Sequence, residues 1–428
     1  MLSFLGFLTV LLFLFVIMTR RVSVTAALII VPVITAAVGG FGPTMGKMML
    51  DGLVRVAPTG IMIVFAIFYF GLMLEVGLFE PMVTKLVKLV KGDPLKVVLA
   101  TAFLAVMVAL DGDGATTFMI TISAMLPLYE RLKMRRLVLS GTICLAAGVM
   151  NIIPWGGPTA RAMTTLRLDA LTIFNPVIPA MLVGLVWVFC VAYYFGLQER
   201  ARLGVQTLDF EHKQELTDEE SALRRPGLIW FNLILTIILV VALIQNYMPL
   251  PILFMIAYAI ALIVNFPNPK DQMARITAQG TNVVFVASMI FAAGIFTGIL
   301  TGTKMIGAMS QTLVSLIPTA LGSYLSLIVA ITSMPLSLVF TPDAYYFGVL
   351  PIISQTAAAF GIEPAQIGRA AILGQMTTGF PLSPLTASTF ILVGMSGVDL
   401  GDHQKFIFKW AFGSTIVMTI VAWATGVI

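Results

Sequence analysis

The sequence Asp111-Gly112-Asp113-Gly114-Ala115-Thr116-Thr117-Phe118 places two acidic residues inside a long apolar region. Residues 94–110 before it contain one charged side chain, Lys96, and residues 119–128 after it contain none. Ionisable side chains at membrane depth cost about 2.5–3.5 kcal/mol each and are retained mostly where a substrate, ion or proton uses them. The glycines permit a sharp turn whose N–H groups can bind an anion. We therefore interpret the stretch as the tip of a helical hairpin.

The composition is that of a membrane protein. Of the 428 residues, 59% are hydrophobic and 11% are charged. The apolar runs have the length of membrane-spanning helices, about 20 residues, and lack the alternation of a β-barrel. The net charge of +5 comes from Lys and Arg at the ends of the runs, which is typical of a membrane protein and argues against nucleic-acid binding. The sequence predicts an all-α, multi-pass protein of the bacterial cytoplasmic (inner) membrane, in which Cys144 and Cys190 are small hydrophobic residues.

The chain contains an internal repeat. Landmarks recur at a nearly constant offset: Gly71 with Gly294, Asp113 with Asp343, Pro127 with Pro351, and Pro154 with Pro381. We predict a first repeat over residues 1–198 (hairpin 93–132, broken helix 137–168), a cytoplasmic linker over 199–226, and a second repeat over 227–428 (hairpin 320–360, broken helix 367–396). Five crossings in each half would invert the second copy, as in secondary transporters. Each hairpin is either re-entrant or a pair of full spans with a tight turn.

Four polar segments interrupt the apolar helices. We call them the first tip (111–117), the first break (151–159), the second tip (333–343) and the second break (377–386). Proline and glycine break helices, and inside a membrane such breaks are tolerated where protein or an aqueous cavity satisfies the freed backbone. We expect all four segments to converge near the midplane. Their hydroxyls, amides and free N–H groups suit an oxyanion such as a carboxylate.

Three aspartates, Asp111, Asp113 and Asp343, would repel a bare anion but can bind a hard cation or carry a proton. Asp111 equally suits a helix cap. Two further charged side chains have two interpretations each. Arg161 pairs with a substrate carboxylate or extends to the membrane interface. Glu75 is a proton relay or makes a scaffold hydrogen bond.

The sequence offers few residues suited to enzymatic catalysis. The two histidines, His212 and His403, fall in the linker and in a predicted cytoplasmic turn, so neither is a catalytic candidate. A membrane enzyme would need a nucleophile with a base, or a zinc motif such as H-E-x-x-H, which the sequence lacks. We therefore expect a transporter that is not an enzyme and has no bound cofactor.

The polar segments carry a family resemblance. The stretches NIIPWGGPTAR (151–161) and GFPLSPLTASTFILVG (379–394), with DGDGATT (111–117) and FTPDAYYFGVLP (340–351), resemble the citrate/metal/proton symporter (CitMHS) family of the ion transporter superfamily over nearly the whole chain. The resemblance implies proton-driven uptake of citrate complexed with a divalent metal, Mg²⁺ or Ca²⁺, by a homodimer with an elevator mechanism. DGDGATT replaces the Ser-Asn-Thr tip of sodium-coupled relatives, which favours a metal or a proton.

The polar segments and the family resemblance together predict a substrate site. The substrate-binding residues are Gly112, Gly114, Ala115, Thr116, Thr117, Asn151, Gly156, Gly157, Pro158, Thr159, Arg161, Ser337, Thr341, Pro381, Ser383, Pro384 and Thr386. The metal is expected at Asp111, Asp113 and Asp343, and proton coupling at Asp113, Asp343 and Glu75. Amphipathic strips at 85–91 and 304–315 are expected to support the dimer. The alternatives are a metal-ion or arsenite/proton antiporter, or a di- or tricarboxylate symporter without metal.

Overall fold

The computed structural model describes all of the chain except residues 20, 91, 206–217 and 246. Residue 91 of one predicted strip, much of the predicted linker, and His212 therefore lie outside the described residues. Within the described residues, the regular elements are all helices. The first half contains α1 (Leu2–Met18), α2 (Val24–Val38), α3 (Gly42–Glu75), α4 (Glu80–Val90), α5 (Pro94–Val108), η1 (Ala109–Asp111), α6 (Gly114–Arg131), α7 (Arg136–Met150), α8 (Gly157–Leu166), α9 (Ala170–Ile173), η2 (Asn175–Val177) and α10 (Ile178–Leu203).

The second half has a similar order of elements. It contains α11 (Asp218–Leu223), η3 (Pro226–Leu228), α12 (Ile229–Ile244), α13 (Leu250–Asn265), α14 (Pro269–Ala278), α15 (Gly280–Gly302), α16 (Met305–Val314), α17 (Thr319–Gly322), α18 (Leu325–Leu336), η4 (Ala344–Val349), α19 (Leu350–Ala358), α20 (Pro364–Ile372), η5 (Phe380–Leu382), α21 (Ala387–Ser396) and α22 (Leu400–Ala424). In both halves a long helix (α3, α15) precedes a helical hairpin, an interrupted helix and a final long helix (α10, α22).

The helices are those of a multi-pass membrane protein. Six helical stretches of the described residues are long and apolar enough to cross a bilayer, and several further apolar helices are shorter. Large apolar side chains on α12, such as Trp230, Ile234 and Ile238, are exposed at its surface. In water such a surface would be unfavourable, whereas lipid tails accommodate it.

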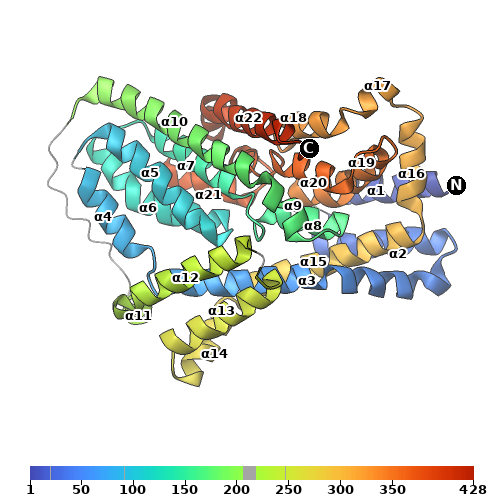
Figure 1. The fold of residues 1–428 in the computed structure, drawn as a ribbon, viewed down its shortest axis with the longest axis horizontal. Coiled ribbons are helices and arrows are strands. Elements are labelled where there is room, and N and C mark those ends of the chain that lie inside the picture. The colour runs from blue at the N-terminus through green and yellow to red at the C-terminus, as the bar shows by residue number, and fades with distance from the viewer. Residues whose placement is uncertain (20, 91, 206–217, 246) are drawn as a thin grey trace.

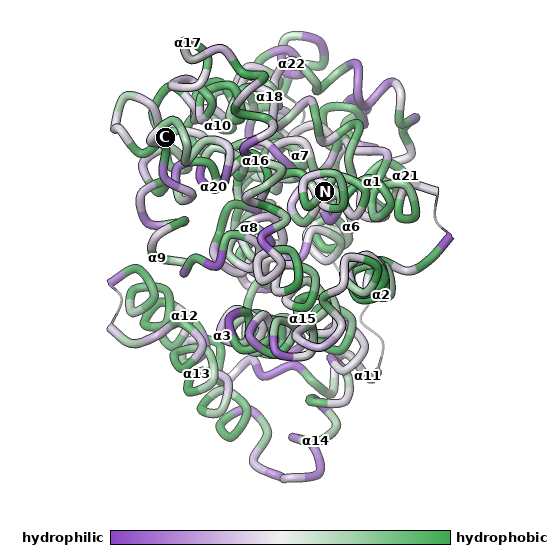
Figure 2. Tube along the Cα trace, turned by 90° about the vertical axis from the view of Figure 1, so that its right-hand side faces the viewer, coloured by the Kyte–Doolittle hydropathy of each residue, from purple (hydrophilic) through white to green (hydrophobic). Residues whose placement is uncertain are grey.

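The helices form two layers. Figures 1 and 2 show α3, α12, α13, α14 and α15 together along the lower part of both views, with the hairpins, the interrupted helices, α10 and α22 above them. Tubes coloured by hydropathy are mostly apolar in both layers, and polar residues gather at the ends and between helices (Figure 2). The helices α3 and α15 contact the upper layer at α8, η1 and η4, and α15 also packs against α2 and α16.

The long helices α3 and α15 pack closely because glycines line their contact. A Cβ at Gly52 would overlap the carbonyl of Gly294, and a Cβ at Gly298 would overlap the carbonyl of Met48. Gly294, Gly298 and Gly302 recur every four residues along one side of α15. Small residues at this spacing allow helix backbones to approach closely in a membrane. This closely packed pair of helices lies below the hairpins and the interrupted helices in Figure 1.

The polar segments lie where helices stop. At the first tip, η1 ends at Gly112, whose φ of 78° is the left-handed conformation that glycine adopts without strain, and α6 begins at Gly114. The first break separates α7 from α8, and the second separates α20 from α21. The second tip joins α18 to a π-helical turn, η4, which continues as α19.

Candidate functional site

A cavity of about 750 Å³ lies where the four polar segments meet. We call it the central cavity. Its lining includes Gly112, Asp113 and Gly114 of the first tip, Asn151, Gly157, Pro158 and Arg161 of the first break and α8, Thr341, Pro342 and Asp343 of the second tip, and Met376, Phe380, Leu385 and Thr386 in and beside the second break. The predicted convergence is therefore present, and the volume is that of a small-molecule site, about 300–1,000 Å³.

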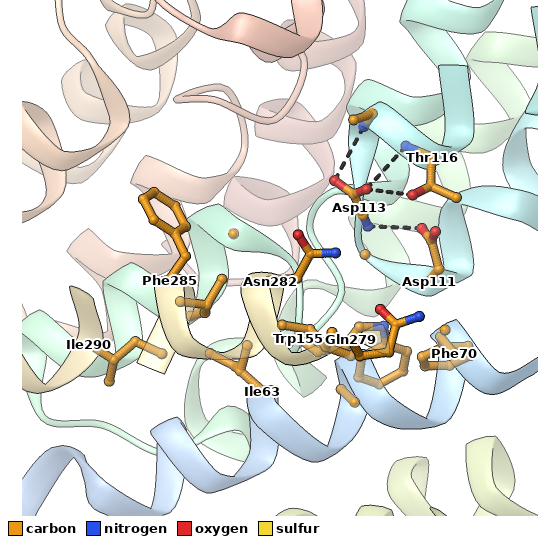
Figure 3. A pocket seen from close by; sticks show the side chains of 18 of the residues that line it. Ile63, Phe70, Asp111, Asp113, Thr116, Trp155, Gln279, Asn282, Phe285 and Ile290 are labelled. Carbon is orange, nitrogen blue, oxygen red and sulfur yellow. Dashed lines mark hydrogen bonds between the residues drawn. The ribbon is translucent and has the colours of Figure 1, made fainter. Parts of the chain in front are cut away.

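A second cavity of about 540 Å³ adjoins the first and extends toward α3 and α15. We call it the side cavity. Figure 3 shows Asp113 and Thr116 of the first tip above Asn282 of α15 and Gln279, the residue that precedes α15. Glu75, Asp111 and Ala115 also line it. Because Asp113 and Arg161 belong to both linings, they mark the boundary between the two cavities.

Asp113 is the N-cap of α6. Its Oδ1 accepts the Ala115 N–H at 3.2 Å, and its Oδ2 accepts the N–H and the hydroxyl of Thr116 at 3.1 and 2.5 Å. Asp111 accepts the N–H of Asp113 at 2.8 Å and is 7% exposed, so it stabilises the turn from a buried position. The predicted cap therefore falls on Asp113 and not on Asp111. Asp113 itself is exposed to the cavities.

Helix N-termini supply donors to the central cavity. The N–H groups of Gly112 and Gly156 already donate to the carbonyls of Ala109 and Ile153 at 3.2 and 2.8 Å. Gly114 and Gly157 are the first residues of α6 and α8, positions whose N–H has no acceptor within the helix. The two helix starts on this lining can therefore bind an anion through Gly114 and Gly157.

Arg161 forms an ion pair with Asp343 across the two halves of the chain. The Nε of Arg161 lies 2.7 Å from Oδ1 of Asp343, with the side chains 17% and 12% exposed. Nη1 donates to the Gly157 carbonyl at 3.1 Å, and Nη2 faces the thioether sulfur of Met289 at 3.4 Å. The guanidinium is therefore held at the wall of both cavities.

Comparisons with known proteins identify the family of this chain. Residues 10–374 match the family model described as CitMHS, citrate transporter. The chain belongs to the CitMHS family of citrate transporters. A "Citrate transporter" of Bacillus subtilis (strain 168) is 56% identical over 428 residues, covering all of both chains. A "Mg(2+)/citrate complex secondary transporter" of the same organism is 50% identical over 435 residues, covering all of this chain and 99% of the relative.

A solved structure shares the fold of this CitMHS protein. The YdaH transporter of Alcanivorax borkumensis, whose crystal structure is described as having an unusual topology, matches with a TM-score of 0.58 at 12% identity. The match covers 90% of this chain and 88% of that one. At this identity the likeness concerns the fold alone.

Glu75 of this CitMHS protein makes contacts within the lower layer. Its Oε2 lies 3.3 Å from Nη1 of Arg275 on α14, and its Oε1 accepts from Gln279, the N-cap residue of α15, at 3.2 Å. These bonds fix the end of α3 against α14 and α15. The scaffold bond, one of the two roles considered for this residue, is therefore present, and the carboxylate also faces the side cavity.

The three predicted metal ligands do not form one cluster. Among the described residues, no group of three or more His, Cys, Asp or Glu side chains is close enough to hold a metal ion. Asp111 and Asp113 share one turn, whereas Asp343 is paired with Arg161. Because Mg²⁺ and Ca²⁺ take six or more oxygen ligands, most ligands of a transported cation would have to come from the substrate or water.

Several predicted substrate ligands of this CitMHS protein hold the breaks together. Thr159 donates to the Ile152 carbonyl at 2.6 Å, and Ser383 donates to the Ser337 carbonyl at 2.6 Å. Ser337 accepts the Met376 N–H at 2.9 Å. The predicted residues that line neither cavity are Thr117, Gly156, Thr159, Ser337, Pro381, Ser383 and Pro384. They shape the cavity without facing it.

Two aromatic side chains missed by the sequence analysis fix the first tip. Trp155 donates from Nε1 to the Leu110 carbonyl at 2.8 Å and stacks on Phe70 of α3 with ring centroids 5.5 Å apart. Phe380 of the second break stacks on Phe118 of α6 at 5.9 Å. The sequence did contain a signal for Trp155, namely a tryptophan inside a Gly/Pro-rich break, where packing alone does not require one.

His403, which was predicted to lie in a cytoplasmic turn, is part of the helix α22. It is fully buried at the start of α22, where Nε2 lies 3.2 Å from the Pro381 carbonyl and Nδ1 lies 3.0 Å from the Ser140 hydroxyl. Its neighbour Gln404 donates to the Leu382 carbonyl at 2.8 Å. This side of α22 packs against the second break.

Proposed function

We propose that this citrate transporter family member imports citrate as a complex with a divalent cation, in symport with protons, across the bacterial cytoplasmic membrane. The observation that carries the proposal is the central cavity, to which all four polar segments contribute. A close relative named as a Mg²⁺/citrate complex transporter supports the same substrate.

Charge favours the complex over free citrate. Two arginines, Arg21 and Arg161, and two aspartates, Asp113 and Asp343, line the central cavity, so their formal charges balance. Free citrate carries three negative charges, and two like charges 4 Å apart repel by about 4 kcal/mol at an effective dielectric of 20. A divalent cation leaves one net negative charge on the complex, which removes most of this repulsion and of the cost of dehydrating the anion.

The groups that line the central cavity are of two kinds, one suited to the cation and one suited to the citrate oxygens. Asp113 has no ion-pair partner among the described residues, and its exposed carboxylate is available to the cation. The citrate oxygens would face the N–H groups of Gly114 and Gly157 and the polar side chains of Thr341 and Thr386. These assignments are our proposal for the substrate site.

Proton coupling and domain motion complete the proposal. The carboxylates of Asp113, Asp343 and Glu75 line the cavities, and these three are our candidates for proton transfer. The two-layer architecture suits an elevator mechanism in which the hairpins and interrupted helices move against α3 and α15 (Figure 1). We place an inverted repeat and a homodimer formed by the lower layer in the same proposal.

Uptake into proteoliposomes tests the substrate. Purified protein would be reconstituted and supplied with labelled citrate in the presence of Mg²⁺, Ca²⁺ or a chelator, with empty liposomes as control and an internal pH dye reporting protons. We expect citrate uptake with the cation, its loss on chelation, and acidification of the interior. Undiminished uptake under chelation would identify a metal-free carboxylate symporter, and cation flux without citrate would identify an antiporter.

A further inference from the structure

We propose that the ion pair between Arg161 and Asp343 is an exchange switch that makes the cation a condition of citrate binding. The empty carrier holds the pair closed. The metal–citrate complex opens it, with the cation taking the Asp343 carboxylate and a citrate carboxylate taking the Arg161 guanidinium. This inference rests on the proposed function and concerns how the same site selects its substrate.

The position of the pair gives both partners access to a ligand. Both residues line the central cavity, and Arg161 also lines the side cavity. The pair is largely buried but not sealed, since the side chains are 17% and 12% exposed. Asp343 comes from the second tip and Arg161 from α8, so the pair also joins the two halves of the chain. A substrate in the central cavity therefore reaches both charges at once.

The hydrogen bonds of Arg161 leave room for a carboxylate. Nε is used by Asp343, and Nη1 by the Gly157 carbonyl. Nη2 has the Met289 sulfur at 3.4 Å, and a thioether is a weak acceptor. A carboxylate that replaced Asp343 would bind across Nε and Nη2, the two-bond geometry that arginine makes with carboxylates. The bond to Gly157 would keep the side chain in place during the exchange.

The exchange explains a requirement for both components. Citrate alone would have to displace Asp343 from Arg161 and leave that carboxylate unpaired at the wall. The cation alone would leave Arg161 unpaired in the same way. Removing one partner of a buried pair is strongly unfavourable, whereas replacing both partners together keeps each charge neutralised. The complex is therefore the only one of the three ligands that leaves no isolated charge.

Reciprocal substitutions test the switch. We would prepare Asp343→Asn, Arg161→Gln and the double variant, with Arg167→Gln as the matched control. Arg167 is the next arginine after Arg161, donates to the Thr297 carbonyl of α15 at 2.8 Å, and lines neither cavity. Binding of MgCl₂ alone, citrate with a chelator, and Mg²⁺ with citrate would be measured by calorimetry on monodisperse protein in detergent.

The expected pattern is reciprocal. Asp343→Asn should bind chelator-treated citrate more tightly than the original protein, and Arg161→Gln should bind Mg²⁺ alone more tightly, each within the 5- to 150-fold range of coupled sites. Both should bind the complex more weakly, and Arg167→Gln should match the original protein. If one single variant does not fold, the gain in binding by the other variant tests the switch by itself. If neither variant gains its single component, the switch is excluded, whereas equal binding of citrate by the original protein with and without chelator would refute the proposed function.

Discussion

The side-chain amide of Asn151 donates a hydrogen bond to the main-chain carbonyl of Met376 at 2.8 Å, across 225 residues of sequence. Asn151 begins the first break, and Met376 lies immediately before the second. Met376 has a φ of 54°, a left-handed conformation that is uncommon for a residue with a side chain. Both residues line the central cavity. The two breaks are therefore joined directly at the wall of the candidate site.

Replacing Asn151 tests this connection. Asn151→Ala removes the donor and should lower stability by about 1 kcal/mol, the net contribution of one hydrogen bond. Asn151→Asp should lower it further, because it places a carboxylate oxygen against the Met376 carbonyl. Thermal unfolding in detergent and citrate uptake would be measured for both. Asn268→Ala is the matched control, because it removes the N-cap of α14 at a similar cost of about 1 kcal/mol but away from the breaks, and it should keep normal citrate uptake. Equal behaviour of the three variants would show that the bond does not hold the breaks.

The glycines between α3 and α15 give a second prediction. Gly298→Ala adds a Cβ that would overlap the Met48 carbonyl of α3. The two backbones must then separate, and overpacking of this kind costs about 1–3 kcal/mol. Gly280→Ala on the same helix meets no atom within 4 Å and should be neutral. Thermal unfolding of the two variants compares them, and similar midpoints would contradict close packing of α3 on α15.

The buried histidine gives a third. His403→Phe keeps an aromatic ring but leaves the Pro381 carbonyl without its partner, whereas the Ser140 hydroxyl loses its contact with the ring and keeps its bond to the Leu137 carbonyl. A buried polar group without a partner costs about 1–3 kcal/mol, so we expect lower stability and reduced citrate uptake. Lys405→Gln, two residues later and exposed, is the control. Normal uptake by His403→Phe would show that the second break does not depend on α22.

The polar segments were predictable because their signal is local. Proline, glycine and aspartate inside apolar runs mark interrupted helices, and the structure brings all four segments to one cavity. Partners far apart in the chain were not predictable. Arg161 and Asp343 are separated by 182 residues, and no sequence pattern pairs them.

Local sequence patterns also did not predict which way the polar side chains of these segments face. Thr159, Ser337 and Ser383 have the oxygen chemistry of substrate ligands, but the Thr159 hydroxyl bonds within the first break, and the hydroxyls of Ser337 and Ser383 join the second tip to residues in and beside the second break. A short irregular segment has no fixed periodicity, so the sequence does not say which side chains face a cavity. The same limit explains why Asp113, and not Asp111, caps α6.

We propose that the four polar segments form one site for a metal–citrate complex. If they do, the complex should protect cysteines introduced in that site from a thiol reagent. Single cysteines at Ala115, Pro158, Thr341 and Ser388 would be placed in a background without Cys144 and Cys190. These positions sample the lining of the two adjoining cavities from both halves of the chain. Asn268→Cys on α14, outside both cavities, is the control.

Labelling rates with a water-soluble thiol reagent would be compared without substrate, with citrate and chelator, and with citrate and Mg²⁺. We predict that citrate with Mg²⁺ slows labelling at all four positions, that citrate with chelator leaves their rates unchanged, and that the control never changes. Protection confined to one half of the chain, or equal protection by citrate without metal, would contradict a single site for the complex.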